Sequence, residues 1–222
     1  MSAVLDLPKT LTKKTQQITT EVVERVTLKG ISWETYERIL AENTEVSNPH
    51  FAYCDGELEI RVLGYQHEHF KEDLSELLIE IARILEIDYQ SSASTTFRRE
   101  KKRKGIEGDN TFYFRNAELI RGRKEIDLLK DPPPELIIEI DITHGSLSKF
   151  PIFAGLEIEE VWRFDGEEVK FYRLENEDYK EVAESVCLPN VKSETVTNLL
   201  FAAQEMKRIE WLKLIHETIK KV

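Results

Sequence analysis

Apolar and acidic side chains alternate between residues 135 and 142, and this is the most informative pattern in the chain. Isoleucines at 138, 140 and 142 alternate with Glu139 and Asp141. Successive side chains of a β-strand point to opposite faces, so the pattern predicts a strand with two carboxylates on one face. These carboxylates would lie roughly 7 Å apart and would repel each other. We therefore expect a cation beside them, either a divalent metal ion or a Lys or Arg side chain.

Helical spacing of apolar residues predicts two helices in the N-terminal half. Ser32 is a typical N-cap for an amphipathic segment over 33–40. From 67 to 85 the apolar residues again follow the three-four spacing of a helix. Between these segments, Asp55 and Gly56 separate two strand-like runs, 51–54 and 57–62, which predicts a β-hairpin.

Strand-like runs dominate the second half of the chain. Segments 94–97 and 111–114 predict strands before the central one, and segments 160–164, 169–174 and 179–183 predict a β-meander after it. A short helix should follow the central strand, with Ser148 as its N-cap and Pro151 in its first turn. From 193 onward an apolar stripe predicts one long C-terminal helix. This order indicates an α/β fold, a mixed β-sheet flanked by helices.

The length of 222 residues suits one domain with appendages. We assign a flexible N-terminal arm to residues 1–24, the folded domain to 25–192 and a C-terminal helical extension to 193–222. No apolar run is long enough to cross a membrane, and the N-terminus lacks the apolar core of a signal peptide. Cys54 and Cys187 are far apart and without metal-ligand spacing, which indicates free thiols. These features favour a cytoplasmic protein.

The formal net charge of −11 argues against nucleic-acid binding by the whole surface. A local basic site is still compatible with it, because residues 98–104 form a dense basic run. Its basic members are Arg98, Arg99, Lys101, Lys102, Arg103 and Lys104. Since the run precedes Asp109, it is either a contact to the nucleic-acid backbone or a solvated loop.

Other common catalytic motifs are absent from the sequence, which has no Gly-rich phosphate loop, no Cys/His cluster with zinc spacing and no Gly-x-Ser-x-Gly elbow. His67, His69 and His144 lack metal-ligand spacing, and His144 is interpreted as a surface-turn residue. We interpret the three tryptophans as core or interface residues rather than as platforms for base stacking.

Several segments together carry a resemblance to a known family. They are residues 30–33, the hairpin at 56–59, His67 and Glu68, Gly108 and Asp109, the segment 132–143, the segment 149–156 and the segment 160–166. This combination resembles the Uma-two family, bacterial proteins predicted to be endonucleases of the PD-(D/E)XK type. The resemblance covers about residues 25–190. It implies a restriction-endonuclease-like mixed sheet flanked by helices, with an N-terminal helix and hairpin.

The resemblance also implies a set of site residues. Asp109 matches the first metal-binding aspartate, and Glu139 matches the strand glutamate. Lys149 matches a lysine that has moved from the strand to the following helix. The superfamily usually has its lysine two residues after the glutamate, where this chain has Asp141. The family often has Pro before the first aspartate, where this chain has Gly108.

The implied chemistry is metal-dependent hydrolysis of DNA. Mg²⁺, or alternatively Mn²⁺, held by Asp109 and Glu139 together with water would stabilise the charge that builds up on the phosphoryl oxygens. Lys149 would orient or deprotonate the attacking water, or neutralise the scissile phosphate. Asp141 would support that metal ion or bind a second one.

Each of these residues also has a structural interpretation. Asp109 follows a glycine and is compatible with a turn, Glu139 with the solvent face of an amphipathic strand, and Lys149 with a solvated first helical turn. An additional acidic group from Glu68 or Glu72 is the weakest assignment, because any exposed helix carries glutamates.

Two other functions remain open at the level of sequence. The first is a nucleic-acid-binding or interaction module that keeps the fold without turnover. The second is a metal-dependent hydrolase of a small phosphate or nucleotide, which would need a closed pocket; a steep salt dependence of DNA binding would argue against it. For an endonuclease we expect a homodimer, since two sites related by a two-fold axis can cut both strands.

Overall fold

The computed structural model describes residues 24–43, 49–142 and 148–221. The predicted arm over 1–24, apart from its last residue, and the turn with His144 lie outside these residues. The elements are β1 Arg25–Leu28, α1 Trp33–Glu42, β2 His50–Cys54, β3 Glu57–Arg61, α2 Tyr65–Ile84, β4 Gln90–Ala93, β5 Thr96–Arg99, the 3₁₀ turn η1 Glu100–Lys102, β6 Lys104–Glu107, β7 Asn110–Tyr113, α3 Ala117–Ile120, β8 Leu136–Ile140, α4 Phe150–Leu156, β9 Glu160–Phe164, β10 Val169–Glu175, β11 Asp178–Val182, α5 Ser193–Glu205 and α6 Arg208–Ile219.

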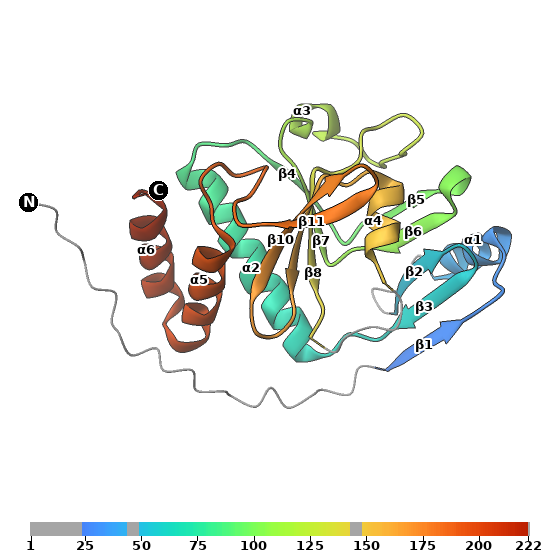
Figure 1. Cartoon of the computed structure of the whole chain (residues 1–222), viewed down its shortest axis with the longest axis horizontal. Coiled ribbons are helices and arrows are strands. Elements are labelled where there is room, and N and C mark those ends of the chain that lie inside the picture. The colour runs from blue at the N-terminus through green and yellow to red at the C-terminus, as the bar shows by residue number, and fades with distance from the viewer. Residues whose placement is uncertain (1–23, 44–48, 143–147, 222) are drawn as a thin grey trace, which may run out of the picture.

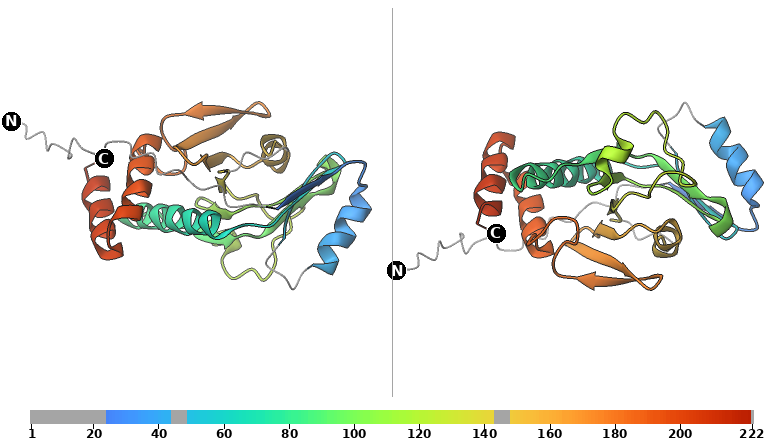
Figure 2. Two further views of the ribbon diagram at one scale, coloured as in Figure 1. Left: turned by 90° about the horizontal axis from the view of Figure 1, so that it is seen from below. Right: turned by 90° about the horizontal axis from the view of Figure 1, so that it is seen from above.

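These strands form two sheets between terminal helices. The first sheet has the order β1-β3-β2-β6-β5 and is antiparallel. The second has the order β11-β10-β9-β8-β7-β4, with β8 and β9 parallel and the other pairs antiparallel. In Figures 1 and 2, α1 lies at one end of the molecule and α5 and α6 at the other. The second sheet is therefore the predicted mixed sheet flanked by helices, whereas the first, antiparallel sheet was not predicted as a separate sheet.

The chain passes from the second sheet to the first between β4 and β5. The strand predicted over 94–97 corresponds to β5, which begins at Thr96, whereas β4 was not predicted and belongs to the other sheet. The register of β4 shifts between Ser91 and Ala93, and Ala93 has a positive φ of 51°. This left-handed residue turns the chain out of the second sheet and toward the first.

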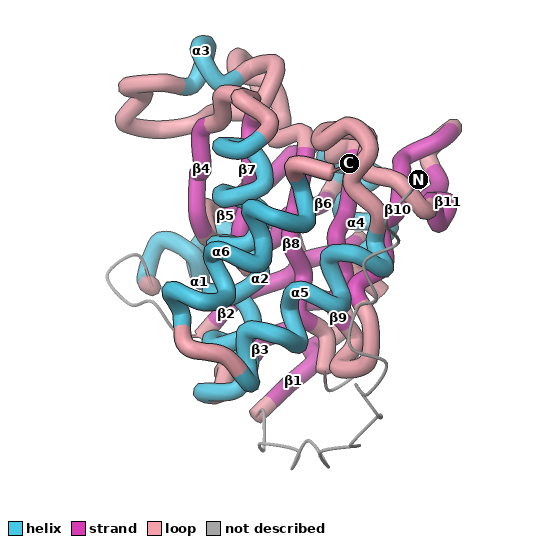
Figure 3. Tube along the Cα trace, turned by 90° about the vertical axis from the view of Figure 1, so that its left-hand side faces the viewer, coloured by secondary structure: helices cyan, strands magenta, loops and turns pink. Residues whose placement is uncertain are grey.

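One face of the second sheet carries the larger apolar core. Leu136, Ile138 and Ile140 of β8 pack there with side chains of α2, α5 and α6, and Figure 3 shows these three helices in front of the strands. Trp162 and Trp211 are fully buried in this cluster, as the sequence predicted for the tryptophans. Because side chains alternate along β8, the residues between the isoleucines must face the other way.

The opposite face of the second sheet packs on α4 and on the first sheet. Ile137 of β8 belongs to this smaller cluster, with Ile152 and Phe153 from α4 and Phe97 and Ile106 from the first sheet. Glu139 has the same strand parity as Ile137. It therefore points into the space between the two sheets, not into the large apolar core.

Helix α1 covers the first sheet through a cluster of aromatic rings. Ser32 is its N-cap, as predicted, and its hydroxyl accepts a hydrogen bond from Thr35 N at 3.2 Å. The Tyr36 ring stacks on Tyr53 with 4.8 Å between ring centroids. It also lies directly over Gly105 of β6, where an added Cβ would be 2.8 Å from Tyr36 Cε1. Glycine is thus required there by the close approach of the ring.

The prediction of one long C-terminal helix is wrong, because the segment is divided into α5 and α6. Met206 between them has an extended backbone, with ψ 155°. The division is set by α2: the fully buried Asp73 accepts hydrogen bonds from Gln204 Nε2 and Arg208 Nη2, both at 2.6 Å. Two helices can place both donors on one carboxylate and still bury the apolar stripe against α2.

The prediction of Ser148 as the N-cap of the short helix is also wrong. Lys149 occupies the N-cap of α4, without a side-chain capping bond, and Pro151 lies in the first turn as predicted. Ser148 is exposed, whereas the Lys149 side chain is turned inward to an acidic partner described below. The helix expected from 67 begins at Tyr65.

Two further findings concern the cysteines and the helices of the described residues. Both Cys54 and Cys187 are free. Within the described ranges, no helix combines the length and the apolar character needed to cross a membrane.

The contact between Tyr36 and Gly105 predicts opposite effects for two substitutions. Gly105→Ala should lower the free energy of unfolding by about 1–3 kcal/mol, because the new Cβ overlaps the Tyr36 ring. Tyr36→Phe should be neutral or stabilise by up to about 1 kcal/mol, because the buried Tyr36 hydroxyl has no hydrogen-bond partner among the described residues. Urea unfolding measures both; a strongly destabilising Tyr36→Phe would contradict this account.

The carboxylate of Asp73 provides a second stability test. Asp73→Ala should cost about 1–3 kcal/mol, since it removes the hydrogen bonds that link α2 to Gln204 of α5 and to the exposed Arg208 of α6. Hydrogen exchange followed by mass spectrometry should show that Asp73→Ala increases the exchange rate, relative to wild type, more across α5 and α6 than across β8. Glu72→Ala, at the neighbouring exposed position, is the matched control and should change neither quantity.

Candidate active site

The pairing of β7 with β8 brings two of the predicted site residues together. Asn110 is the partner of Ile138 in this antiparallel ladder, so continuing the register by one residue sets Asp109 opposite Glu139. Residues directly opposite each other share a face of the sheet, with Cβ atoms about 4.5–5.5 Å apart. Asp109 and Glu139 are each only 1% exposed. The sequence-distant carboxylates thus form one buried acidic pair.

Gly108 allows the chain to reach this register. A Cβ at Gly108 would lie 2.5 Å from Cδ1 of Ile137. The link between β6 and β7 therefore passes so close to β8 that the side chain of any other residue would have to displace Ile137. This close approach accounts for glycine at the position where the resembling family often has proline.

Asp109 is held in its ionised form by donors from two elements. Its Oδ2 accepts a hydrogen bond from Ile140 N at 2.7 Å and lies 3.2 Å from Nε2 of His67. Burial alone would raise the pKa of Asp109, but the charge and hydrogen bond of His67, with the charges of Arg61 and Lys149, outweigh burial and lower it. The other oxygen, Oδ1, is buried and has no hydrogen-bond partner among the described residues.

Glu139 meets two cations on one of its oxygens. Lys149 Nζ forms an ion pair with Oε1, and Nη1 of Arg61 lies 3.5 Å from the same atom. Oε2 is buried and without a hydrogen-bond partner in the described part of the chain. Burial, together with the charge of Arg61, lowers the pKa of Lys149 well below its ordinary value. The structure thus brings Asp109, Glu139 and Lys149 into one cluster, and the predicted cation beside the carboxylates is present.

The first sheet contributes charged residues to the site that the sequence did not predict. Arg61 of β3, 3% exposed, lies with its Nε 3.6 Å from Oε1 of the buried Glu59, and Nε of Arg25 lies 3.6 Å from Oε2 of Glu59. The sequence pattern that could have indicated this buried charged face lies in 57–61, where charged and apolar residues alternate as they do around Glu139. Such alternation does not show which face is solvated. Here the charged face of the hairpin turns inward.

His67 links Asp109 to the first turn of α2. Its Nδ1 lies 3.5 Å from Oε1 of Glu68. Burial alone would lower the pKa of His67, but Asp109 and Glu68 outweigh burial and raise it. Glu68 also forms an ion pair with Lys71, and the hydrogen bond from His67 is the main cause that lowers the pKa of Glu68 to about 2. Of the two glutamates considered, Glu68 is therefore connected to Asp109 through the imidazole, whereas Glu72 is exposed.

Asp141 lies at the edge of this cluster. Its Oδ2 accepts hydrogen bonds from Arg163 Nη2 at 2.7 Å and Nε at 3.2 Å. Arg163 is the neighbour of Glu139 in the parallel ladder with β9. Asp141 is thus half-buried and held by Arg163, while Glu139 is held by Lys149 and Arg61.

The basic run 98–104 forms the hairpin of β5, η1 and β6. Arg103 at its turn is separated from Asp109 by roughly 20 Å of extended chain. Four of its cations form ion pairs: Arg98 with Glu37, Arg99 with Glu157, Lys102 with Glu177 and Lys104 with Asp55. Arg103 donates to the Tyr53 hydroxyl at 3.1 Å, and Lys101 is exposed. The hairpin therefore presents less free positive charge than the sequence suggests.

The acidic pair has the donor chemistry that Mg²⁺ requires. Asp109 Oδ1 and Glu139 Oε2 are hard oxygen donors, and no hydrogen bond satisfies either of them within the described ranges. Those ranges contain no group of three or more His, Cys, Asp or Glu side chains arranged to hold a metal ion. Mg²⁺ is commonly bound by one or two carboxylates with several waters retained, so two carboxylates suffice for a fit.

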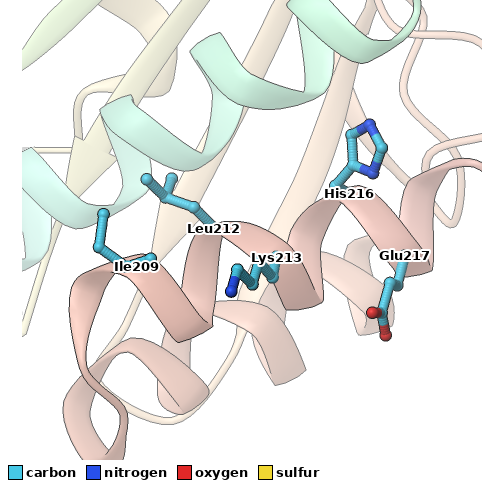
Figure 4. Close-up of a pocket in the computed structure, with 5 residues that line it drawn as sticks. All are labelled: Ile209, Leu212, Lys213, His216 and Glu217. Carbon is cyan, nitrogen blue, oxygen red and sulfur yellow. The ribbon is translucent and has the colours of Figure 1, made fainter.

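A separate hollow lies on the C-terminal helix, on the α2 side of the second sheet. It has a volume of about 300 Å³ and is lined by α6 residues (Figure 4), namely Ile209, Leu212, Lys213, His216 and Glu217. It is open to solvent and contains none of the residues of the acidic cluster.

Comparison with solved structures supports the assignment of the fold. The crystal structure of a "putative nuclease belonging to DUF820" from Anabaena variabilis matches with a TM-score of 0.51 and 15% sequence identity. The match covers 72% of this chain and 98% of that chain. At this identity the similarity concerns the fold. None of the curated proteins matches the sequence.

A family model matches much more of the sequence than the short motifs around the acidic pair. The Uma2 model, described as "Putative restriction endonuclease", matches residues 33–202. This range includes α1, both sheets from β2 onward and most of α5. It also includes Asp109, Glu139, Arg61, His67 and Lys149. The chain therefore belongs to the Uma2 family and has the restriction-endonuclease-like fold that its sequence predicted.

Proposed function

We propose that the protein is a Mg²⁺-dependent endodeoxyribonuclease that hydrolyses phosphodiester bonds of DNA. The observation that carries the proposal is the acidic pair, in which Asp109 and Glu139 each keep one buried oxygen without a hydrogen-bond partner among the described residues, beside Lys149. The Uma2 model is described as "Putative restriction endonuclease" and the solved neighbour as a "putative nuclease", and both descriptions support the same reaction class.

Asp109 Oδ1 and Glu139 Oε2 would hold the metal ion, and Mn²⁺ would be accepted as well. When bound, the ion would stabilise the negative charge that develops on the phosphoryl and leaving oxygens. The other oxygens are already engaged: Ile140 N and His67 hold Asp109 Oδ2, and Lys149 holds Glu139 Oε1. These contacts would fix the orientation of both carboxylates, and the positive charge of His67 would keep Asp109 ionised.

Lys149 is proposed to act on the attacking water. Burial lowers the pKa of the Lys149 amine well below its ordinary value, which would make it a better proton acceptor than an exposed lysine. With 11% of its side chain exposed, Lys149 is also the most exposed member of the central group of Asp109, Glu139, Arg61, His67 and Lys149. Substrate would therefore approach from the side of Lys149 and would have to loosen its ion pair with Glu139.

DNA is the proposed partner, and a homodimer is the proposed assembly. Two sites related by a two-fold axis would allow both strands to be cut in one binding event.

One observation favours an alternative, a catalytically silent nucleic-acid-binding or interaction module. Lys149 and Arg61 already pair with Glu139, and His67 pairs with Asp109, so both carboxylates have positive partners without a metal ion. The two functions differ in turnover, which can be measured directly.

The nuclease proposal predicts cleavage that depends on the acidic pair. Wild-type protein should nick plasmid DNA in Mg²⁺ or Mn²⁺, and EDTA should stop the reaction. Asp109→Asn and Glu139→Gln should each lower the rate at least about 100-fold, and Lys149→Met about 10–100-fold, because each removes a charge at the reacting centre. Gel electrophoresis of supercoiled, nicked and linear plasmid measures all three.

Glu72→Gln on the exposed face of α2 is the matched control and should retain wild-type activity. Circular dichroism should show that every variant is folded. If wild-type protein does not cut DNA with any divalent metal, or if both acidic variants cut at the wild-type rate, the nuclease proposal fails and the silent module is the better interpretation.

Metal binding can be tested without DNA. For a site with a dissociation constant of about 1 mM, 10 mM Mg²⁺ should add roughly 1.4 kcal/mol to the free energy of unfolding, which corresponds to a rise of about 3–6 °C in Tm. The rise should disappear in Asp109→Asn and Glu139→Gln and persist in Glu72→Gln. Differential scanning calorimetry gives the values; an equal rise in all four proteins would show that Mg²⁺ binds elsewhere.

A further inference from the structure

Arg61 is a buried cation whose contacts are incomplete. It comes from β3 of the first sheet, is 3% exposed, and reaches Glu139 across the space between the sheets with Nη1 at 3.5 Å. Its Nε and Nη2 are also buried, and neither has a hydrogen-bond partner among the described residues. The nearest acid to Nε is Glu59 at 3.6 Å, which is an ion-pair distance but too long for a hydrogen bond.

An unsatisfied guanidinium in this position is energetically unfavourable. Arginine stays charged in proteins and carries five N–H donors in a planar fork. Leaving a buried donor unpaired costs about 1–3 kcal/mol, and more when the group is charged. A tetrahedral oxyanion would satisfy two donors of such a fork at once, because the spacing of its oxygens matches the spacing of adjacent N–H groups.

The strand itself does not provide the expected cation. The residue two positions after Glu139 is Asp141, and it is paired with Arg163. Lys149 and Arg61 therefore supply the positive charge from outside the strand, one from α4 and the other from the first sheet. Both contact Oε1 of Glu139, so they lie beside one another, while Oε2 has no hydrogen-bond partner within the described part of the chain.

We infer that Arg61 binds the phosphodiester group of the substrate, with its Nε and Nη2 donating to two non-bridging phosphate oxygens. This inference rests on the proposed function for the identity of the substrate, but it concerns an anion site that exists independently of turnover. In this assignment two residues take the roles of the lysine that the superfamily usually has at the position of Asp141. Arg61 binds the phosphate, and Lys149 acts on the attacking water.

The competing interpretation is that Arg61 only ties the two sheets together through Glu59 and Glu139. A lysine at position 61 would preserve the positive charge that pairs with Glu59 and Glu139, but it would lack the two coplanar N–H donors of the guanidinium. Arg61→Lys therefore separates the two interpretations. Arg25→Lys is the matched control, because Arg25 contacts the opposite oxygen of the same Glu59 and is not an ion-pair partner of Glu139.

Binding of inorganic phosphate to the full chain, measured by isothermal titration calorimetry in EDTA, is the primary test. Wild-type protein should bind phosphate. Arg61→Lys should weaken the affinity at least about 10-fold, and Arg25→Lys should change it less than about 2-fold. Equal affinity of wild type and Arg61→Lys would overturn the inference, and so would a wild-type protein that does not bind phosphate.

A second measurement needs no substitution and therefore does not depend on the variant folding. In wild-type protein labelled with ¹⁵N and ¹³C, titration with phosphate should shift the Arg61 Nε–Hε resonance by NMR, while that of the exposed Arg83 should stay in place. An unmoved Arg61 resonance at saturating phosphate would contradict the assignment.

The outcomes keep this inference distinct from the nuclease proposal. If phosphate binds through Arg61 but no DNA is cut, the anion site stands and the nuclease proposal fails. If DNA is cut and Arg61→Lys cuts as fast as wild type with an unchanged KM, the nuclease proposal stands and the assignment of Arg61 is wrong. When both hold, Arg61→Lys should lower kcat about 10–100-fold and leave the Mg²⁺-induced rise in Tm intact.

Discussion

The balance of charge around Asp109 and Glu139 is the constraint on which the rest of the structure depends. Two carboxylates set opposite each other between two sheets cannot both stay ionised unless cations approach them closely. His67 from α2, Arg61 from β3 and Lys149 from the start of α4 provide those cations. Three elements remote in sequence must therefore converge on one register pair of β7 and β8. Removal of any one of them would leave a buried charge without its partner, which is far more costly than the loss of a surface ion pair.

This convergence also explains why the fold has two sheets joined at a polar centre. On one face of the second sheet, the isoleucines of β8 complete a large apolar core with α2, α5 and α6. On the other face, Ile137 belongs to a smaller core with α4 and the first sheet, and Glu139 stands beside it on the same face. A fully apolar contact between the sheets would be the simpler way to join them. The buried charged groups in its place are the reason to look for chemistry there, since strongly perturbed titratable groups gather at functional sites.

Local signals in the sequence were sufficient for most elements near this site. The Asp-Gly turn, the Ser32 cap and the alternation around Glu139 each depend on neighbouring residues alone, and each prediction is confirmed. The errors arose where distant groups decide. The contacts of Asp73 with Gln204 and Arg208 divide the predicted C-terminal helix into α5 and α6. Lys149, not Ser148, is the N-cap of α4, and its side chain points inward. The positive φ of Ala93 turns the chain between β4 and β5, which belong to different sheets. No local pattern contains the position of Asp73 relative to residues more than a hundred positions later.

The sequence by itself predicted the strand that carries Glu139 and a cation near Glu139 and Asp141, because side-chain alternation and charge repulsion are local properties; the strand ends at Ile140, one residue before Asp141. Together with the family resemblance, it also identified Asp109 and Lys149 as candidates. Only the tertiary structure decided which of these residues meet. The antiparallel register places Asp109 opposite Glu139, Arg163 holds Asp141 at the edge, and the inward-facing hairpin adds Arg61. Register and the choice of buried face depend on contacts between segments far apart in the chain, and these contacts exist only after the two sheets have packed together.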